Sequence, residues 1–138
     1  MTALTNRRDI VDGLSHIVGI GLDLVEISRV ARSLERWGDR LVNKLMDGDE
    51  AGRLPAGGAD RASAVALAIA LKEAASKALG TGWSHGVAWR QVVVAADPPV
   101  RLTGRAEEVA RIRGSSGRTT VAVETRGDLL LAEVWLLG

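Results

Sequence analysis

The stretch from Asp60 to Leu79 constrains the fold more than any other part of the sequence, because it runs for 20 residues without glycine or proline. It consists largely of alanine and leucine, which are strong helix formers. Gly80 follows it directly, as is typical of a helix C-terminus. The first half of the stretch is apolar nearly all round, so the sequence predicts a long helix buried at the centre of the molecule.

The segments on either side of this helix change between strand and helix patterns. Residues 17–27 are β-rich, with Asp23 and Glu26 as their only charges, and they predict a largely buried strand interrupted by two glycines. The other expected elements are strands at 87–95, 100–102, 119–124 and 129–137, and helices at 28–37, 39–46 and 105–113. This order predicts an α+β fold in which an antiparallel sheet packs on the long central helix and on shorter helices.

Capping residues and glycines mark the ends of the shorter helices. We expect Ser28 and Thr103 to cap the helices that follow them. Gly38 and Gly114 are expected to end those helices. The Asp-Gly-Asp sequence at 47–49 is expected to stop the helix at 39–46.

Length and composition limit the class of protein. The chain has 138 residues, about one domain, and we expect a tail at 1–15 followed by a single domain at 16–138. It has no cysteine, which excludes disulfides and thiolate metal sites and is compatible with a cytoplasmic protein. The net charge of +1 favours no class of partner, including nucleic acid. No apolar run is long enough to span a membrane, and residues 1–15 lack the apolar core of a signal peptide.

The first candidate functional motif is Gly19-x-Gly21-x-Asp23, inside the first expected strand. The two glycines allow a ligand or another backbone to approach closely. A carboxylate in an apolar strand is costly unless it is paired or holds a cation. The alternative is an aspartate that caps a turn or pairs with an arginine. A dinucleotide-binding glycine motif does not fit, because position 24 is leucine and no strand, glycine turn and helix unit of the right length follows.

The second candidate is the pair Glu73 and Lys77, which lie four residues apart and so share one face of the long helix. An exposed ion pair is the usual explanation of this spacing. The two preceding turns are apolar, however, which suggests that the pair lies where a buried helix emerges into a cleft. There the carboxylate can bind Mg²⁺ and the lysine can offset phosphate charge.

The third candidate is a row of basic residues formed by Arg29, Arg32 and Arg36. Their spacing of three and four residues places all three on one helix face. The row is either a solvated polar face or a surface that binds an acidic partner. His16 and His85 form no motif.

Taken in this order, the motifs resemble those of the holo-acyl-carrier-protein synthases, the small single-domain branch of the phosphopantetheinyl transferases. Gly-Ile-Gly-Leu-Asp-Leu-Val-Glu-Ile at 19–27, followed by Arg29, is similar to the first signature of that family. Leu-Lys-Glu-Ala-Ala-Ser-Lys-Ala-Leu-Gly-Thr-Gly at 71–82 is similar to the second, about fifty residues later. A looser similarity continues through 86–102 and the terminal hairpin.

The resemblance implies a Mg²⁺-dependent enzyme that transfers 4'-phosphopantetheine from coenzyme A to a serine of an apo-acyl carrier protein. It also implies a cytoplasmic homotrimer that acts in lipid metabolism, with the carrier left open between fatty-acid and polyketide biosynthesis. The implied catalytic residues are Asp23, Glu73 and Lys77, of which Asp23 and Glu73 hold the metal. The implied coenzyme A contacts are Lys72, Lys77, Gly80, Thr81 and Gly82, and the implied carrier contacts are Arg29, Arg32 and Arg36.

The chain departs from the family pattern in two places. Ala68 and Ile69 stand where many relatives have an Arg-Phe pair. The sequence Ala-Val-Glu-Thr at 122–125 stands where many relatives have Ser-x-Ser-His. A catalytically degenerate relative that binds coenzyme A or a carrier protein therefore stays as an alternative. An unrelated magnesium–nucleotide hydrolase is a weaker one, because the chain has no Gly-x-x-x-x-Gly-Lys-Ser/Thr loop.

Overall fold

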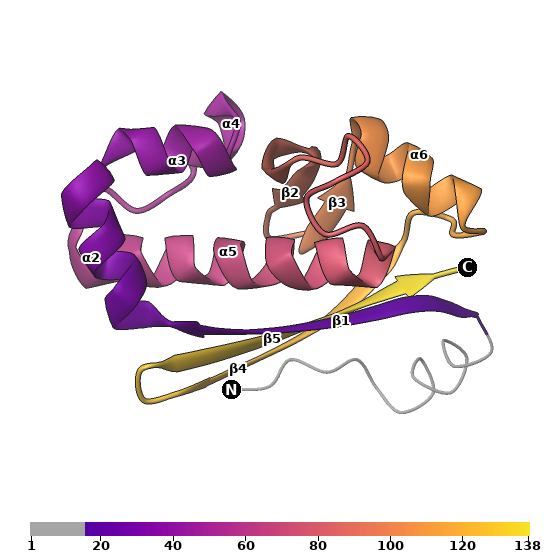
Figure 1. Cartoon of the computed structure of the whole chain (residues 1–138). Coiled ribbons are helices and arrows are strands. Elements are labelled where there is room, and N and C mark those ends of the chain that lie inside the picture. Colours follow the sequence, from indigo (N-terminus) through magenta and orange to yellow (C-terminus); the bar gives the residue numbers. More distant parts are fainter. Residues whose placement is uncertain (1–15) are drawn as a thin grey trace.

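In the computed structural model, residues 16–138 are described, and the expected tail at 1–15 lies outside them. The long helix α5 (Gly58–Leu79) runs across one face of a three-stranded sheet (Figure 1). The sheet consists of β1 (Ile17–Glu26), β4 (Thr119–Arg126) and β5 (Leu129–Leu137). β5 lies in the middle and pairs antiparallel with both neighbours, which confirms the predicted α+β fold.

The shorter elements cover the other side of α5 (Figure 1). At one end of the long helix are three helices that follow β1 in the chain. At the other end of the long helix are a small two-stranded sheet and a last helix, which come after α5 in the chain. These elements are α2 (Ile27–Trp37), α3 (Asp39–Leu45), α4 (Gly48–Gly52), the 3-10 turn η1 (Trp89–Gln91), β2 (Val92–Val94), β3 (Val100–Leu102) and α6 (Gly104–Ile112).

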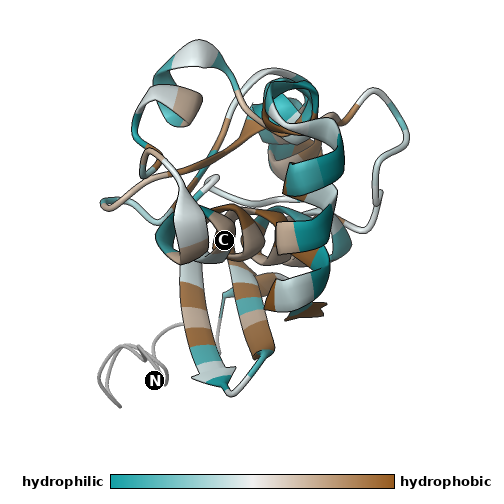
Figure 2. Ribbon diagram, turned by 90° about the vertical axis from the view of Figure 1, so that its left-hand side faces the viewer, coloured by the Kyte–Doolittle hydropathy of each residue, from teal (hydrophilic) through white to brown (hydrophobic). Residues whose placement is uncertain are grey.

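Helix α5 is the centre of the molecule, as its sequence predicts. Figure 2 shows a mostly hydrophobic α5 in the middle and hydrophobic bands along the strands. One group of buried apolar side chains joins the second half of α5 to β5 and α6, and a second group joins its first half to α2 and α3. Gly80 ends the helix in the left-handed conformation, with φ of 81°. No helix within residues 16–138 has the length and apolarity needed to cross a membrane.

Gly19 and Gly21 allow β1 to lie directly on α5. A Cβ atom at Gly19 would come within 2.0 Å of the Ala78 carbonyl oxygen, and one at Gly21 within 1.8 Å of the Ala74 carbonyl oxygen. Any side chain at these positions would therefore push the strand away from the helix. The sequence left open whether the two glycines allow a ligand or another backbone to approach closely. In the structure, the backbone of α5 is what approaches them.

Two local expectations were wrong, and a third was incomplete. The strand predicted at 87–95 is reduced to β2, because the segment before it turns through η1. Thr103 stands at the N-cap of α6 without a side-chain cap, since its hydroxyl donates to the Gln91 carbonyl oxygen. Helix α3 does end before 47–49, but this sequence also begins α4, where Asp47 Oδ1 accepts a hydrogen bond from the Glu50 amide at 2.8 Å.

The N-terminus of α2 also differs from its prediction. Ser28 lies inside the helix rather than capping it, and Glu26 at the N-cap makes no side-chain cap. The cap comes from Asp128, in the turn between β4 and β5. The Asp128 carbonyl oxygen accepts a hydrogen bond from the Ile27 amide at 2.8 Å, and Oδ1 accepts one from the Ser28 amide at 2.9 Å. A helix end is thus capped from 100 residues away in the chain.

Candidate functional site

A hollow of about 440 Å³ lies where β1, α2 and α5 meet. Its polar wall contains Asp23 from β1, Glu73 from α5 and Arg29 from α2. The remaining lining residues are Leu24, Val25, Glu26, Val30, Ser33, Leu41, Ile69 and Leu129. Residues from both signature-like segments, about fifty positions apart in the sequence, therefore share one hollow.

Asp23 projects from β1 toward α5 because it follows Gly21 by two residues, the period of a strand. Its carboxylate forms an ion pair with the Lys77 ammonium, with Oδ1 and Nζ 3.1 Å apart. Lys77 Nζ also donates to the Leu22 carbonyl oxygen at 3.1 Å. The aspartate side chain is 17% exposed and the lysine side chain 51%. Asp23 lines the hollow whereas Lys77 is not among its lining residues, and the pair is open to solvent on the lysine side.

Glu73 lines the hollow, but within residues 16–138 it forms no ion pair with Lys77. The spacing of four residues puts both side chains on one face of α5. The partner that Lys77 takes, however, comes from β1. Glu73 is half-buried, and its carboxylate is therefore available to bind another group in the hollow.

Lys72 is placed differently from what the resemblance implied. Its side chain is fully buried, and Nζ lies 2.9 Å from the Glu50 carboxylate of α4. Nζ also donates to the carbonyl oxygens of Trp89 and Val92. These three partners occupy all three donors of the ammonium. The expectation that Lys72 contacts coenzyme A is thereby corrected, because its charge is directed into the core.

Burial of the ion pair between Lys72 and Glu50 shifts the pKa of the lysine. Loss of hydration lowers the pKa of Lys72, while the hydrogen bond and charge of Glu50 oppose that shift. The Glu50 carboxylate also accepts a hydrogen bond from the Val94 amide, at 3.1 Å. Lys72 and Glu50 therefore tie α4 and β2 to α5 and serve the structure rather than the hollow.

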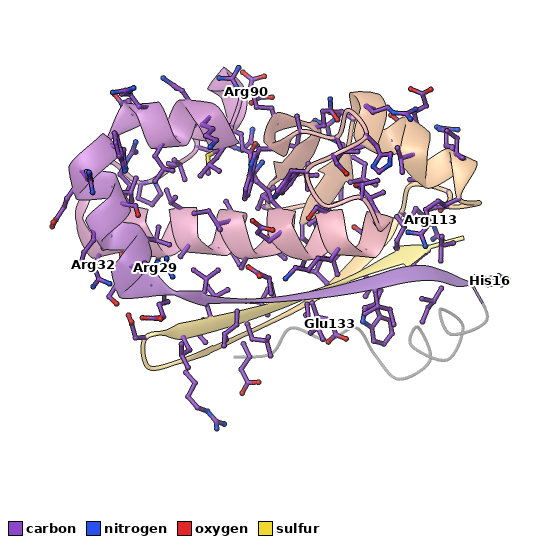
Figure 3. The ribbon with its side chains drawn as sticks, viewed as in Figure 1. His16, Arg29, Arg32, Arg90, Arg113 and Glu133 are labelled. Atoms are coloured by element: carbon purple, nitrogen blue, oxygen red, sulfur yellow. The ribbon has the colours of Figure 1, made fainter. Side chains whose placement is uncertain are left out.

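The other expected site residues lie outside the wall of the hollow. Gly80, Thr81 and Gly82 form the turn after α5, in which the Gly82 amide donates to the Ser76 carbonyl oxygen at 3.1 Å. Arg32 and Arg36 are exposed on α2, with Arg32 on the side of the β4–β5 turn (Figure 3). Of the three arginines, Arg29 alone lines the hollow.

An exposed tryptophan extends the basic surface of α2. Trp37 is 45% exposed, and the guanidinium groups of Arg36 and Arg40 lie 4.9 and 5.7 Å from its ring centre. Such contacts hold an arginine over an aromatic face without removing its charge. Trp37, Arg40, Leu41 and Lys44 also line a shallow hollow of about 250 Å³ on this surface.

Sequence reasoning missed several residues of functional or structural weight. Ser33 lines the hollow but belongs to no motif considered in advance, while Glu26 and Ile69 also line it and were given no role there. Glu50 could have been found, because Asp47 followed three residues later by Glu50 is typical of a helix N-terminus. Asp128 could not, because nothing local links it to α2.

Asp23 and Glu73, two of the three carboxylates that line the hollow, form a suitable oxygen donor set for a hard divalent cation. They come from two rigid elements, and Mg²⁺ is commonly held in proteins by one or two carboxylates together with water and phosphate oxygens. Within residues 16–138 no group of three or more such side chains gathers. A cation bound here would therefore complete its shell with oxygens of a ligand or of water.

Comparison with known proteins places the chain in a family. Residues 19–127 match the model of a family described as "4'-phosphopantetheinyl transferase superfamily". A holo-[acyl-carrier-protein] synthase of Methylobacterium nodulans is 40% identical over 88% of this chain and 95% of its own length.

Solved structures agree with these sequence relatives. The crystal structure of a holo-[acyl-carrier-protein] synthase from Neisseria meningitidis is 27% identical, with a TM-score of 0.75, and the match covers 88% of this chain and 99% of that one. The synthase of Bacillus anthracis, solved in complex with coenzyme A (3',5'-ADP), is 26% identical with a TM-score of 0.68, covering 89% and 98%. This chain therefore belongs to the 4'-phosphopantetheinyl transferase superfamily, within its holo-[acyl-carrier-protein] synthase branch.

Proposed function

We propose that the chain transfers 4'-phosphopantetheine from coenzyme A to a serine hydroxyl of an apo-acyl carrier protein. The serine oxygen forms a bond to the β-phosphorus of the diphosphate, and the bond from that phosphorus to the bridging oxygen breaks. Adenosine 3',5'-bisphosphate leaves with the bonding electrons. The observation that carries the proposal is that Asp23 and Glu73, one from each signature-like segment, share the wall of one hollow.

Asp23 and Glu73 would hold the Mg²⁺ that this reaction requires. When bound, the cation would neutralise charge on the diphosphate of coenzyme A. Asp23 is oriented by the close packing of β1 on α5, and Glu73 by the helix itself. Glu73 is also one of two candidates for the base that takes the serine proton, the other being a water molecule in the hollow.

Lys77 would place a positive charge beside the transferred phosphate. Its ammonium is half-exposed and already lies at Asp23, so a rotation of the side chain brings it to a phosphate without breaking a buried contact. Phosphoryl transfer depends mainly on alignment and charge neutralisation, and one lysine with two carboxylates can supply both. The turn at Gly80, Thr81 and Gly82 is proposed to lie near the nucleotide.

Arg29, Arg32 and Arg36 are proposed to contact an acidic helix of the carrier protein. Arg29 links this surface to the hollow, because its side chain belongs to both. A carrier that docks on α2 would therefore bring its serine close to Asp23 and Glu73. Opposite charges on the two partners would also raise the rate of encounter.

The test is intact-mass spectrometry of an apo-acyl carrier protein incubated with this protein, coenzyme A and Mg²⁺. We expect a mass gain of one phosphopantetheine over several turnovers, and no gain when a chelator is present. If several carriers gain no mass while coenzyme A still binds, the chain is a degenerate relative that acts as a binding module. Ile69, which lines the hollow with an aliphatic side chain, would then be the first residue to replace by a basic or aromatic one.

A homotrimer is proposed as the working form. The face of the sheet that points away from α5 exposes large apolar side chains, namely Ile20, Leu22, Leu24, Leu129 and Leu131, which are 38–59% exposed. Glu133 lies among them, between Leu22 and Ala122 of the neighbouring strands (Figure 3). An exposed apolar surface of this kind on a folded chain is typical of an interface.

The oligomeric state can be measured by light scattering coupled to size exclusion. We expect a mass of three chains for the wild type and a smaller mass for Leu131→Asp, because the new charge would be buried at the interface. Lys44→Ala is the control, since Lys44 is an exposed residue of α3, on the other side of α5 from the sheet, and this variant should keep the wild-type mass. A monomeric wild type at working concentration would refute the trimer.

A cytoplasmic location is proposed as well. The absence of cysteine and the nature of the proposed substrates support it.

A further inference from the structure

The turn between β4 and β5 is joined to the first turn of α2. Besides the two amide contacts to Asp128, the Ser28 hydroxyl donates to Asp128 Oδ2. The tip of the hairpin and the start of α2 accordingly lie together in Figure 1. Three hydrogen bonds thus hold one helix end against a turn that is distant in sequence.

Core packing of Ile27 and Val30 holds the inner face of α2, but the first turn of the helix has no cap of its own. It contains no acidic residue there, and its N-cap residue makes no side-chain cap. A negative charge at a helix N-terminus complements the helix dipole, and Asp128 supplies that charge from outside the helix. The hydrogen bond from Ser28 lowers the pKa of the Asp128 carboxyl, and the Arg32 charge lowers it further, so the carboxylate stays ionised.

The same turn of the helix carries the residues that face the hollow. Arg29 follows Ser28 directly and lines the hollow, while Arg32 is close enough to Asp128 to act on its charge. Leu129, the residue after Asp128, also lines the hollow. The cap therefore acts on the segment that carries Arg29 and Arg32, whereas Asp23 and Glu73 belong to β1 and α5.

We propose that Asp128 is a positioning residue for carrier-protein docking, which acts by fixing the start of α2 and with it the basic side chains of that helix. The inference rests on the proposed function of α2 as the docking helix. If Asp128 were a purely structural cap, its loss would lower the stability of the protein and leave the ratio of the two KM values unchanged. Loss of a positioning residue raises the KM for the carrier protein more than the KM for coenzyme A.

The test compares steady-state constants of three variants, with a bacterial apo-acyl carrier protein and coenzyme A as substrates. For Asp128→Ala we expect the KM for the carrier to rise about three- to tenfold, the range of one or two weakened surface charge contacts. The KM for coenzyme A and kcat should stay within about twofold of the wild type. Asp128→Asn keeps an acceptor for the Ser28 amide and should recover most of the carrier KM.

Asp47→Ala is the matched control, because it also removes an aspartate cap, from α4 rather than α2. It should leave the ratio of the two KM values unchanged. The inference is overturned if Asp128→Ala leaves the carrier KM as it is, if it raises both KM values equally, or if Asp47→Ala gives the same pattern.

Direct binding of the apo-carrier, measured by calorimetry without coenzyme A, separates this inference from the proposed function. A wild type that binds the carrier but transfers nothing refutes the transferase, and the effect of Asp128→Ala on the dissociation constant then decides the inference. A wild type that binds no carrier overturns the inference as well.

Discussion

Lys72 and Lys77 lie five residues apart on α5, yet the structure places them in opposite environments. Lys72 is fully buried and is held by Glu50 and two carbonyl oxygens. Lys77 is half-exposed and forms an ion pair with Asp23, which lines the hollow. A step of five residues turns by roughly 140° around a helix, so the two side chains leave α5 in different directions.

A lysine in a signature-like motif can therefore serve either the fold or the chemistry. Burial of an ammonium group costs desolvation free energy, so a buried lysine needs a hydrogen-bond partner for each of its donors. No donor is then free to bind a ligand. An exposed ammonium contributes little to stability and can move to a phosphate. Loss of Lys72 should therefore affect folding, and loss of Lys77 should affect the rate of transfer.

Replacement of Lys72 should have the largest effect. Lys72→Met leaves Glu50 buried without a partner and should lower the free energy of unfolding by about 3 to 5 kcal/mol. Urea denaturation followed by circular dichroism measures the loss. The double variant Lys72→Met with Glu50→Leu removes both charges and should regain much of the stability. A single variant that loses less than about 1 kcal/mol would show that the pair does not hold the fold.

Replacement of the carboxylates in the hollow should come next. Asp23→Ala and Glu73→Ala should each lower kcat by roughly 10² to 10³, by analogy with the loss of one electrostatic contact in other active sites. The carrier mass assay measures the rate, and thermal unfolding should show a folded protein. Asp39→Ala is the matched control, because Asp39 also pairs with a basic residue, Arg61 at 3.6 Å, but lies away from the hollow. Full activity of Asp23→Ala would refute the metal assignment.

Replacement of Lys77 should show most clearly how its role differs from that of Lys72. Lys77→Ala should lower kcat/KM by about 10- to 100-fold, because a charge beside the phosphate is lost. Its free energy of unfolding should change by less than about 1 kcal/mol, since the ion pair is half-exposed. Lys77→Arg keeps the charge and should retain more activity than Lys77→Ala. A loss of stability equal to that of Lys72→Met would contradict the distinction between the two lysines.

The smallest effect concerns the exposed carboxylate of Asp128. Its folded-state pKa is lowered, so its contribution to stability is present above the ordinary aspartate pKa of about 3.9 and is lost as the pH falls through the lowered value. Wild type and Asp128→Asn should therefore differ most in thermal midpoint above about pH 4 and converge in stronger acid. A difference that is constant down to acid pH would show that the charge of Asp128 plays no part in the cap.

Much of the fold could be predicted from the sequence because the signals are local. The alanine-rich stretch predicted α5, and Gly80 marked its end. The alternation of strands and turns predicted the β4–β5 hairpin. The short elements were harder, because the strand pattern at 87–95 does not reveal that Lys72 draws the Trp89 and Val92 carbonyl oxygens to itself.

The candidate site was predicted in part for the same reason. Spacing placed Glu73 and Lys77 on one helix, and the glycines marked the segment that carries Asp23. Spacing could not reveal that Lys77 pairs with Asp23, since that contact depends on how closely β1 packs on α5. The roles of these residues in metal and substrate binding stay predictions.

The sequence by itself determined the long central helix, the glycine-containing strand and the membership of a family, because each depends on residue types at fixed local spacing. Only the tertiary structure decided that Lys72 is a core residue, that Gly19 and Gly21 admit a helix, and that Asp128 caps α2. The physical reason is that burial and partner choice depend on which segments meet in space. These contacts cannot be inferred from the residues next to each position in the chain.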